Sequence, residues 1–417
     1  MDQKKAFEIL KKGYNVYLTG AAGSGKTYLL NKYIEYLKKN KIGVAKTAST
    51  GIAATHMDGM TIHSWSGLGV NDSMDAKKIK KIKTQRRMQK RFEKTKVLIL
   101  DEISMLHHYQ LDLLDKICKS FKDPFLPFGG LQVVLSGDFF QLPPVSKGDD
   151  SAKFVVNSKI WSEADLKICY LDKSYRQKDD KMMFILNSIR ERKVGQETVD
   201  LLNSRTGKRV EGKVEPTWLF SHNLDVDAMN ITELKKIDEP AFRYKMKLSG
   251  NKYLTQTLKK NCLSPEELYL KKGAKVMFVK NNFEKGYVNG TVGTVTGFNK
   301  DGFPKVETEN GKVILALPEE WIMEDEGGDI LALAEQIPLR LAWAITVHKS
   351  QGMTLDAVEM DLSRVFEYGM GYVALSRCAR LDGISLLDFN QMALEVNPAV
   401  HELDKDLKKQ SENQANL

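Results

Sequence analysis

Short apolar runs alternate with longer amphipathic stretches along the first part of the chain. Four runs rich in apolar and β-branched residues end in small or polar residues, at 16–20, 44–50, 97–102 and 132–138. Between the first two, the stretch 28–40 carries its apolar residues at the spacing of one helical face. Strands that alternate with helices predict a parallel sheet covered by helices on both faces.

Further along the chain, a second series of apolar runs predicts a second α/β domain. These runs lie at 217–220, 341–350, 357–363 and 384–389. Between them, residues 245–335 change to short strands and turns, which predict a small antiparallel β-barrel inserted in the second domain. Within this β-rich region, Asn289-Gly290 is typical of a hairpin turn, because both residues tolerate positive φ.

The expected domain limits follow from the two series of apolar runs. The limits are 1–170 for the first domain with a basic insertion at about 66–96, 171–244 and 336–404 for the second domain, 245–335 for the β insertion, and 405–417 for a frayed polar tail.

Composition narrows the class of protein. The chain has 417 residues, of which 42% are hydrophobic and 28% charged, as is ordinary for a folded protein. Its net charge of +9 favours a polyanionic partner. No segment reaches the ~18 consecutive apolar residues of a membrane helix, and no signal peptide is evident. The four scattered cysteines form no C-x-x-C pair. We therefore expect a reduced, cytoplasmic protein with no membrane partner.

The clearest chemical motif is GAAGSGKT at 20–27, which matches the phosphate-binding pattern G-x-x-x-x-G-K-[ST] in full. An apolar strand precedes it and an amphipathic helix follows it. Its glycines let backbone N–H groups converge on phosphate oxygens at a helix N-terminus. Lys26 is expected to pair with the β- and γ-phosphates, and Thr27 to coordinate Mg²⁺. The motif alone leaves kinases, GTPases, motor ATPases and helicases open.

The segment LILDEIS at 98–104 supplies two carboxylates at the end of an apolar strand. Asp101 is expected to hold Mg²⁺ through its water shell. Glu102 is placed to orient and deprotonate the attacking water, a role that a small-molecule kinase does not need. The alternative is that both residues only cap the next helix. Together with the phosphate loop, the pair predicts hydrolysis of a nucleoside triphosphate.

A third segment, SGDFFQLPPV at 136–145, follows another apolar strand. Gln141 in this segment is placed to sense the γ-phosphate, and the two prolines that follow fix the direction of the chain. Taken alone, the segment is also consistent with a simple turn.

These three motifs, in this order, resemble the first motor domain of superfamily 1 DNA helicases. The continuation resembles the PIF/RecD-like branch, which moves 5′ to 3′. The matching segments are TASTGIAATHMDGMTIHSW at 47–65, ISMLHHYQLDLLDKI at 103–117, NGTVGTV at 289–295, AITVHKSQGMTLD at 344–356 and YVALSRCAR at 372–380. The resemblance implies two RecA-like P-loop domains with parallel sheets, a small basic insertion in the first and an SH3-like β-barrel in the second. It also implies a compact bacterial or phage-type motor. Separately, we expect the protein to be a monomer.

The resemblance assigns roles at the nucleotide site. Arg176 resembles the arginine that reaches the γ-phosphate from the start of the second domain, and Arg377 resembles the arginine finger. Both supply positive charge where the transferred phosphoryl group gains negative charge. Gln3 takes the place of the adenine-reading glutamine. The implied nucleotide contacts are Gln3, Gly20, Gly23, Ser24, Gly25, Lys26, Thr27, Gln141 and Gly352.

On the DNA side, the matching positions carry mostly hydroxyls, amides and imidazoles, which suit phosphate oxygens and do not read sequence. Trp65 is expected either to stack on a base or to fill the core of its domain. The implied single-strand contacts are Thr50, His63, Ser64, Trp65, Asn223, Thr346, His348, Lys349 and Ser350.

The most basic part of the chain is the run 77–96, which holds eleven Lys or Arg residues against one acid, Glu93. One interpretation is a helix with a solvated lysine-rich face. The other, implied by the resemblance, is a wedge-like insertion near the duplex junction.

The leading hypothesis is an ATP-dependent 5′-to-3′ DNA helicase that uses ATP and Mg²⁺ between two RecA-like domains. It is expected to translocate on single-stranded DNA and to unwind forked duplexes. Whether it also unwinds G-quadruplexes or RNA–DNA hybrids is left open by the sequence. The first alternative is a DNA-stimulated ATPase that clamps single strands without processive unwinding. The second is a phosphotransferase for a small metabolite, for which the sequence shows no clear acceptor site.

Overall fold

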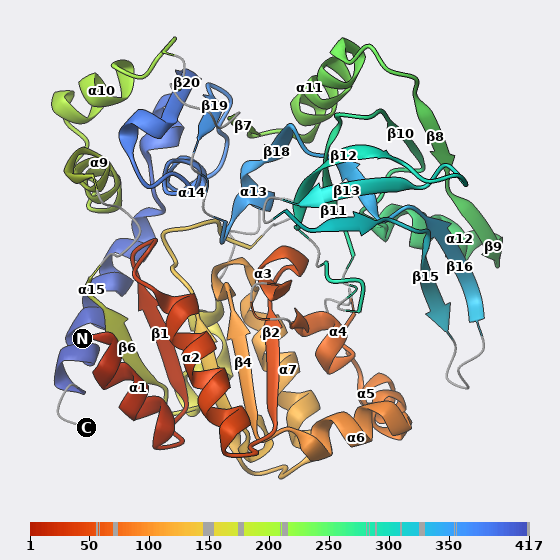
Figure 1. Ribbon diagram of the computed structural model, residues 1–417. Helices are drawn as coiled ribbons and strands as arrows, with labels where there is room; N and C mark the ends of the chain where they lie inside the picture. Colours follow the sequence, from red (N-terminus) through yellow and green to blue (C-terminus); the bar gives the residue numbers. More distant parts are fainter. Residues whose placement is uncertain are drawn as a thin grey trace. The chain divides into compact units, whose positions relative to one another are not determined.

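The apolar runs of the first part of the chain form a six-stranded sheet in the order β3-β2-β4-β5-β1-β6 (Figure 1). Every neighbouring pair in this sheet runs parallel. Strands β1 (Val16–Gly20) and β4 (Val97–Asp101) are buried along their whole length, as expected for a parallel sheet covered on both faces. The parallel sheet predicted from the alternating pattern is therefore confirmed.

The computed structural model divides into two compact units, which are described separately. The first comprises residues 1–221 and 347–417, and the second comprises residues 222–346. The structure describes residues 1–55, 57, 59–69, 74–144, 154–173, 179–208, 210, 216–280, 282, 284–287, 290–308, 311–324, 330–353, 355 and 357–414.

The core of the first unit lies between the sheet and two helices, α1 (Gln3–Lys11) and α2 (Lys26–Lys39). The apolar face of α2 consists of Leu29, Leu30, Tyr33, Ile34 and Leu37. These side chains pack on residues of β1, β4, β5 and β6. Because α2 begins directly after the phosphate loop, this packing fixes the loop at the carboxyl end of β1.

The remaining elements of the first unit connect this sheet to a second, smaller one. Its strands within this unit are β7 (Thr217–Phe220), β19 (Val358–Leu362) and β20 (Ile384–Phe389), which pair in parallel in that order. The other strands of the unit are β2 (Val44–Ala48), β3 (Met60–Thr61), β5 (Gln132–Ser136) and β6 (Lys167–Leu171). Its other helices are α3 (Gly51–Thr55), α4 (Ile62–Ser66), α5 (Ala76–Thr84), α6 (Arg86–Lys94), α7 (His108–Phe121), α8 (Lys159–Glu163), α9 (Asp180–Arg190), α10 (Gln196–Asn203), α13 (Val347–Ser350), α14 (Met370–Leu375) and α15 (Pro398–Asn413).

The second unit is rich in antiparallel strands. One sheet has the order β14-β13-β12-β11-β17 and encloses a core that includes Val276, Phe278, Val306 and Leu339. The hairpin residue Asn289 lies outside the described residues, and the SH3-like barrel stays a prediction. The elements of this unit are α11 (Asn223–Lys236), β8 (Phe242–Lys245), β9 (Lys247–Gly250), α12 (Lys252–Asn261), β10 (Glu267–Leu270), β11 (Lys275–Phe278), β12 (Val292–Phe298), β13 (Pro304–Thr308), β14 (Val313–Leu315), β15 (Glu319–Glu324), β16 (Ile330–Gln336), β17 (Leu339–Leu341) and β18 (Ala344–Thr346).

The expectation of a frayed tail from residue 405 is wrong. Residues 398–413 form the helix α15, which packs on β6. Asp404, Leu407 and Ser411 are buried, and the hydroxyl of Ser411 accepts a hydrogen bond from the backbone N–H of Tyr170 (3.0 Å). The segment is polar because part of its buried face makes hydrogen bonds, which a hydrophobicity pattern does not reveal.

None of the four cysteines, all of which lie in the described part of the chain, forms a disulfide. Cys118, Cys169 and Cys378 are buried, whereas Cys262, the residue after α12, is half-buried. Burial raises the pKa of the Cys169 thiol to about 12. Within the described part of the chain, no helix is both long and apolar enough to cross a membrane.

Candidate functional site

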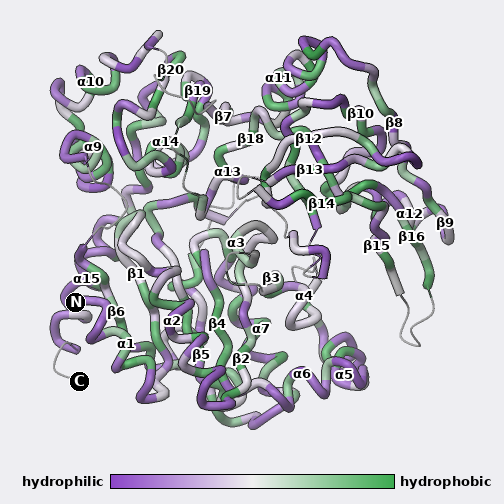
Figure 2. Tube along the Cα trace, in the orientation of Figure 1, coloured by the Kyte–Doolittle hydropathy of each residue, from purple (hydrophilic) through white to green (hydrophobic). Residues whose placement is uncertain are grey.

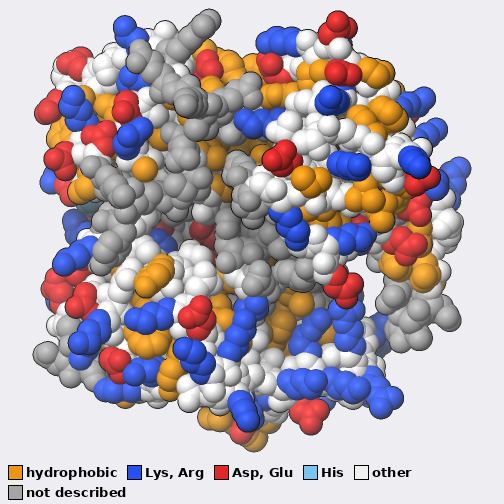
Figure 3. All heavy atoms as spheres, in the orientation of Figure 1, with side chains coloured by type: hydrophobic (Ala, Val, Ile, Leu, Met, Phe, Trp, Pro, Cys, Tyr) orange, Lys and Arg blue, Asp and Glu red, His pale blue; other side chains and the backbone are white. Residues whose placement is uncertain are grey.

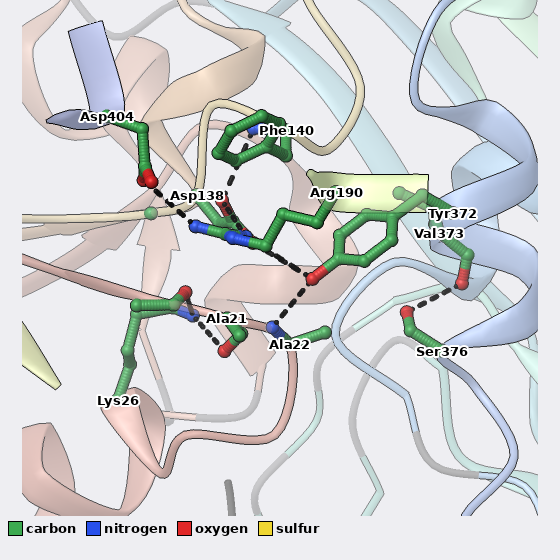
Figure 4. Close-up of polar contacts among 12 residues, drawn as sticks. Ala21, Ala22, Lys26, Asp138, Phe140, Arg190, Tyr372, Val373, Ser376 and Asp404 are labelled. Atoms are coloured by element: carbon green, nitrogen blue, oxygen red, sulfur yellow. Dashed lines mark hydrogen bonds and ion pairs between the residues drawn. The ribbon is translucent and has the colours of Figure 1, made fainter. Parts of the chain in front are cut away.

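The phosphate loop connects β1 to α2 and is shaped by its glycines. Gly20 has φ +146°, and a Cβ on this residue would lie 2.6 Å from the carbonyl oxygen of Leu171. Gly25 is the N-cap of α2, with φ 83° in the left-handed region that favours glycine. The Nζ of Lys26 donates to the carbonyl oxygens of Gly20 (2.8 Å) and Ala21 (3.2 Å) (Figure 4). Burial lowers the pKa of Lys26 below the usual value for lysine.

The two carboxylates follow β4. Asp101 is 5% exposed and accepts a hydrogen bond from the backbone N–H of Glu102 (2.9 Å). Burial, and then the neighbouring Glu102 charge, raise the pKa of Asp101 to about 6. Glu102 has φ 55° and ψ 46°, a left-handed conformation that is unusual for a residue other than glycine. Such strained positions cluster at functional sites.

A residue that sequence reasoning missed holds Glu102. Gln351 follows α13, and its Nε2 donates to the Oε2 of Glu102 (2.9 Å). The segment HKSQG contains this glutamine, but the family resemblance assigns roles only to its neighbours. Glu102 and Gln351 are 249 positions apart, so no local sequence pattern indicates that they form a hydrogen bond.

A cavity of ≈ 420 Å³ brings the phosphate loop together with distant segments. It joins the P-loop to the carboxylate after β4, to the segment after β5, and to the segments after α13 and α14. Several of the predicted nucleotide contacts line it, as do Glu102 and Arg377. Its lining residues are Ala22, Gly23, Gly25, Lys26, Thr27, Tyr28, Glu102, Gln141, Gly352, Arg377 and Ala379.

Unsatisfied polar atoms at this cavity fit a polar ligand. Oε1 of Gln141, a residue that lines the cavity, is buried and has no hydrogen-bond partner within the described structure. The same is true of Ser24 Oγ in the phosphate loop and of Oε1 of Gln351. Buried polar atoms are normally paired, so the atom that lines the cavity, Oε1 of Gln141, is a candidate for contact with a bound polar ligand.

Two further predicted residues lie at the site. Gln3 is the first residue of α1, and its Nε2 donates to the carbonyl oxygen of Ser24 (3.2 Å) in the phosphate loop. Arg377 is 1% exposed, and its Nη1 donates to the carbonyl oxygens of Ser350 and Met353 (both 3.2 Å). Arg176 lies outside the described residues, so its role stays a prediction.

The residues predicted to contact DNA near α3 and α4 differ in how exposed they are. Thr50, just before α3, accepts a hydrogen bond from the backbone N–H of Ala53 (3.3 Å), and Ser64 is exposed on α4. His63 is partly buried, which lowers its pKa. Trp65 is 3% exposed and packs on Phe92, with ring centroids 4.7 Å apart. Its indole packs in the core, which is the second of the two expectations for this residue, and a contact with a base stays a prediction.

The predicted strand contacts near α13 differ in accessibility. His348 and Lys349 are partly exposed, and the Nε2 of His348 lies 3.4 Å from the Oε2 of Glu367. Ser350 is fully buried, and its hydroxyl donates to the carbonyl oxygen of Val347 (2.7 Å). Its hydroxyl is bonded within the helix, and the contact of Ser350 with a DNA strand stays a prediction.

Two predicted contacts belong to the second unit. Thr346 ends β18 and is buried. Asn223 begins α11, and its side chain lies outside the described residues. Their roles on DNA stay predictions.

The basic run forms the two helices α5 and α6. Figure 2 shows both as predominantly hydrophilic, and Figure 3 shows Lys and Arg side chains gathered over them. Met88 and Phe92 are the buried residues of α6, and Arg91 donates to the carbonyl oxygens of Ser64 (2.9 Å) and Trp65 (2.6 Å). The two helices α5 and α6 are thus amphipathic: they pack on the first unit through buried residues and carry Lys and Arg on their outer face. We call the exposed Lys and Arg side chains of α5 and α6 the basic face.

The fold and the cavity define a P-loop nucleoside triphosphatase. An arginine that precedes the last strand of a second parallel sheet lines the same cavity as the phosphate loop. The chain belongs to the PIF1-like helicase family. The family model described as PIF1-like helicase matches residues 1–203, and that of the DNA helicase Pif1 2B domain matches residues 253–298.

Individual relatives agree with this assignment. The ATP-dependent DNA helicase Pif1 of Psychrobacter sp. (strain PRwf-1) is 42% identical, over 98% of this chain and 71% of that protein. The crystal structure of Pif1 helicase from Candida albicans has a TM-score of 0.91 at 35% identity, over 97% of this chain and 98% of that chain. The crystal structure of Pif1 helicase from Bacteroides in complex with ADP-AlF3 and ssDNA has a TM-score of 0.81 at 29% identity. The match covers 98% of this chain and 96% of that chain. The chain spans less than two thirds of the length of the vertebrate relatives that it matches.

Proposed function

We propose that this chain is an ATP-dependent DNA helicase that translocates on single-stranded DNA and separates strands at a fork. The observation that carries the proposal is the cavity in which the phosphate loop, Glu102, Gln141 and Arg377 converge. This set combines a phosphate cradle, a carboxylate base and a cation for developing charge, which nucleoside triphosphate hydrolysis requires. The ADP-AlF3 and ssDNA bound to the Bacteroides relative support ATP and a single strand as the ligands.

Thr27 and Asp101 are the residues that would hold Mg²⁺. Asp101 is a buried carboxylate next to the second carboxylate of Glu102, and the pKa of Asp101 is raised to about 6. Thr27 contributes a hydroxyl from the first turn of α2. Oxygen donors of this kind fit a hard divalent cation. When bound, the cation would neutralise charge on the β- and γ-phosphates.

Hydrolysis would divide among four side chains that line the cavity, and a fifth, Gln351, would position one of them. Glu102 accepts the proton of the attacking water, and Gln351 holds its carboxylate in place. Lys26 and Arg377 provide positive charge on the transferring phosphoryl group. Gln141, which also lines the cavity, would contact the γ-phosphate through the N–H of its side-chain amide.

Gln351 also offers a route from DNA binding to hydrolysis. It directly follows α13, which carries the predicted strand contacts His348 and Lys349. A strand bound at α13 would therefore bias the position of Gln351 and, through it, of Glu102. This coupling would make hydrolysis depend on a bound strand. The 5′-to-3′ direction of travel follows from the family resemblance.

The test is a single-turnover unwinding assay on partial duplexes that carry a 5′ tail or a 3′ tail. The proposal expects ATP-dependent strand separation of the 5′-tailed duplex only. Lys26→Ala should abolish hydrolysis while the protein stays folded and still binds single strands. Lys38→Ala, an exposed lysine at the other end of α2, is the matched control and should behave as the unmodified protein.

Three outcomes would count against parts of this proposal. DNA-stimulated hydrolysis without strand separation on either tail would indicate a single-strand clamp. Unwinding of the 3′-tailed duplex would reverse the direction. Retained turnover in Lys26→Ala would contradict the phosphate assignment.

A further inference from the structure

A buried polar cluster lies next to the phosphate cavity, and the hydrolysis described above does not use it. It centres on Arg190, the last residue of α9, which is 6% exposed. The Nη1 of Arg190 donates to both carboxylate oxygens of Asp138 (2.9 and 2.8 Å), and its Nη2 donates to Asp404 Oδ1 (3.1 Å) and Tyr170 Oη (2.9 Å). The guanidinium also lies over the ring of Phe140, 4.1 Å from the ring centroid (Figure 4).

Tyr372 connects this cluster to the phosphate loop. It lies on α14 and is 1% exposed. Its hydroxyl accepts hydrogen bonds from the backbone N–H of Ala22 (3.1 Å) and from Nη1 of Arg190 (3.3 Å) (Figure 4). Asp138 Oδ2 lies 3.5 Å from the same hydroxyl. One oxygen atom thus joins the main chain of the phosphate loop to the cluster.

A glycine provides a second contact between α14 and the cavity wall. Gly369 is the N-cap of α14, with φ 79°. A Cβ at this position would lie 2.5 Å from the carbonyl oxygen of Phe140 and 2.7 Å from that of Gln141. Only glycine permits this approach and this backbone conformation. The start of α14 therefore rests directly on the segment that carries Gln141.

The same helix sets the position of Arg377. Nε of Arg377 donates to the carbonyl oxygen of Val373 (2.8 Å) on α14, and Nη2 donates to Ser376 Oγ (2.7 Å). The Ser376 hydroxyl in turn donates to the carbonyl oxygen of Val373 (2.9 Å) (Figure 4). Two of the guanidinium nitrogens are bound at α14 and the third to Ser350 and Met353, so a shift of α14 against the phosphate loop would displace Arg377.

Physical reasoning explains why such a cluster would be retained. Buried ion pairs are stripped of solvation and often contribute little net stability, so a geometric role is the better-attested reason for keeping one. Catalytic cations act over short distances, and a displacement of about 1 Å can cost on the order of 100-fold in rate. A rigid link between the phosphate loop and the helix that carries Arg377 meets this requirement.

We propose that Tyr372 is a positioning residue: with Arg190 and Asp138, its hydroxyl locks α14 to the phosphate loop and so places Arg377 at the γ-phosphate. The proposal rests on the proposed ATP hydrolysis and deepens it. Tyr372 itself touches no reacting atom.

The test is Tyr372→Phe, which keeps the ring and removes only the hydroxyl. We expect kcat for DNA-stimulated ATP hydrolysis to fall about tenfold, with KM for ATP within about twofold, since the variant removes one positioning hydrogen-bond group. Equilibrium binding of ADP with aluminium fluoride, which imitates the transferring phosphoryl group, should weaken by a similar factor. Binding of ADP alone should stay unchanged, because it does not engage Arg377.

The matched control is Tyr33→Phe. Tyr33 is also a buried tyrosine, and its hydroxyl donates to the carbonyl oxygen of Leu10 (3.0 Å) and to Gln132 (2.8 Å). It should reproduce any general decrease in stability without changing kcat. A Tyr372→Phe protein with unchanged kcat, or one that binds ADP and ADP–aluminium fluoride equally more weakly, would overturn the proposal.

A double variant separates positioning from an independent effect. If Tyr372 acts through Arg377, Tyr372→Phe combined with Arg377→Ala should be no slower than Arg377→Ala alone. Rate reductions that multiply would overturn the proposal. Absence of DNA-stimulated hydrolysis in the unmodified protein would instead contradict the proposed function, so the two failures are distinguishable.

Discussion

The backbone of Glu102 shows how a single residue reports on function. A left-handed conformation costs a residue with a side chain of order 1–3 kcal/mol, and Glu102 adopts it with φ 55°. Two contacts hold it there, from the hydroxyl of Ser49 to its carbonyl oxygen (2.6 Å) and from Gln351 to its carboxylate (2.9 Å). The strain therefore coincides with the proposed general base.

At this scale we predict that Glu102→Gln lowers kcat for ATP hydrolysis by at least about 100-fold. ATP binding should be retained, because the amide keeps the shape of the side chain and only the basic group is removed. Steady-state hydrolysis and equilibrium binding of a fluorescent ATP analogue measure the two effects. Glu35→Gln, at an exposed position on α2, is the control. A kcat within about threefold of the unmodified protein would remove Glu102 from the base role.

The role of a motif residue can be predicted from the sequence where the backbone conformation requires that residue type. The glycines of the phosphate loop are such a case, since Gly20 and Gly25 adopt conformations that favour glycine. The burial of Trp65 and Ser350 is not predictable from the motifs, because a motif gives the position of a side chain along the chain but not its direction. Burial of both depends on contacts within the folded unit.

At the scale of elements, α15 shows how a polar segment becomes structural. Asp404 accepts from both Arg190 (3.1 Å) and the hydroxyl of Tyr170 (2.9 Å), and Lys408 pairs with its other oxygen (2.9 Å). The helix is thus attached through charge and hydrogen bonds as well as through apolar residues. Its sequence reads as solvated because Tyr170 and Arg190 lie far earlier in the chain.

We predict that Asp404→Ala lowers the free energy of unfolding by about 1–3 kcal/mol, because it leaves two buried donors without this acceptor. Urea unfolding followed by circular dichroism measures the change. Asp406→Ala, on the exposed face of the same helix, should change stability by less than about 0.5 kcal/mol. Equal effects from the two variants would show that the cluster contributes nothing specific.

The basic face of α5 and α6 is the second element with a clear expectation. Lys80→Ala with Lys83→Ala should weaken binding to forked DNA and reduce the slope of log affinity against log salt by up to ~0.9 for each phosphate that the protein no longer neutralises. Both lysines are exposed. Hydrolysis without DNA should be unaffected.

The matched control for the basic face is Lys38→Ala with Lys39→Ala. These are exposed lysines at the end of α2 and carry the same charge change. Fluorescence anisotropy at several salt concentrations compares the two pairs. An equal decrease of affinity and slope in both would mean that only net charge matters, and that α5 and α6 form no dedicated surface.

At the scale of the whole molecule, the alternating pattern predicted the parallel sheets because strand and helix periodicities are local properties. The convergence of the cavity walls was not predictable from pattern alone. Lys26 and Arg377 are far apart in the sequence, and only the family resemblance assigned them to one site. Domain limits inside the second half rest on long-range pairing, so the expected boundaries there stay predictions.

A cavity walled by distant segments should make nucleotide binding stabilise the first unit as a whole. At a concentration about 100 times its dissociation constant, a non-hydrolysable ATP analogue should add about 2.7 kcal/mol to the free energy of unfolding. Denaturant unfolding with and without the analogue measures this difference. This gain in the free energy of unfolding should vanish in Lys26→Ala. If that variant is stabilised as much as the unmodified protein, the analogue binds at another site.

The uneven exposure of the four thiols gives the chain a natural handle for labelling. Cys118, Cys169 and Cys378 are shielded, so a maleimide dye should attach first at Cys262, which belongs to the β-rich second unit. The raised pKa of that thiol calls for mildly alkaline labelling. The unmutated chain would then report, by fluorescence during turnover, how the β-rich unit responds to each cycle of the motor.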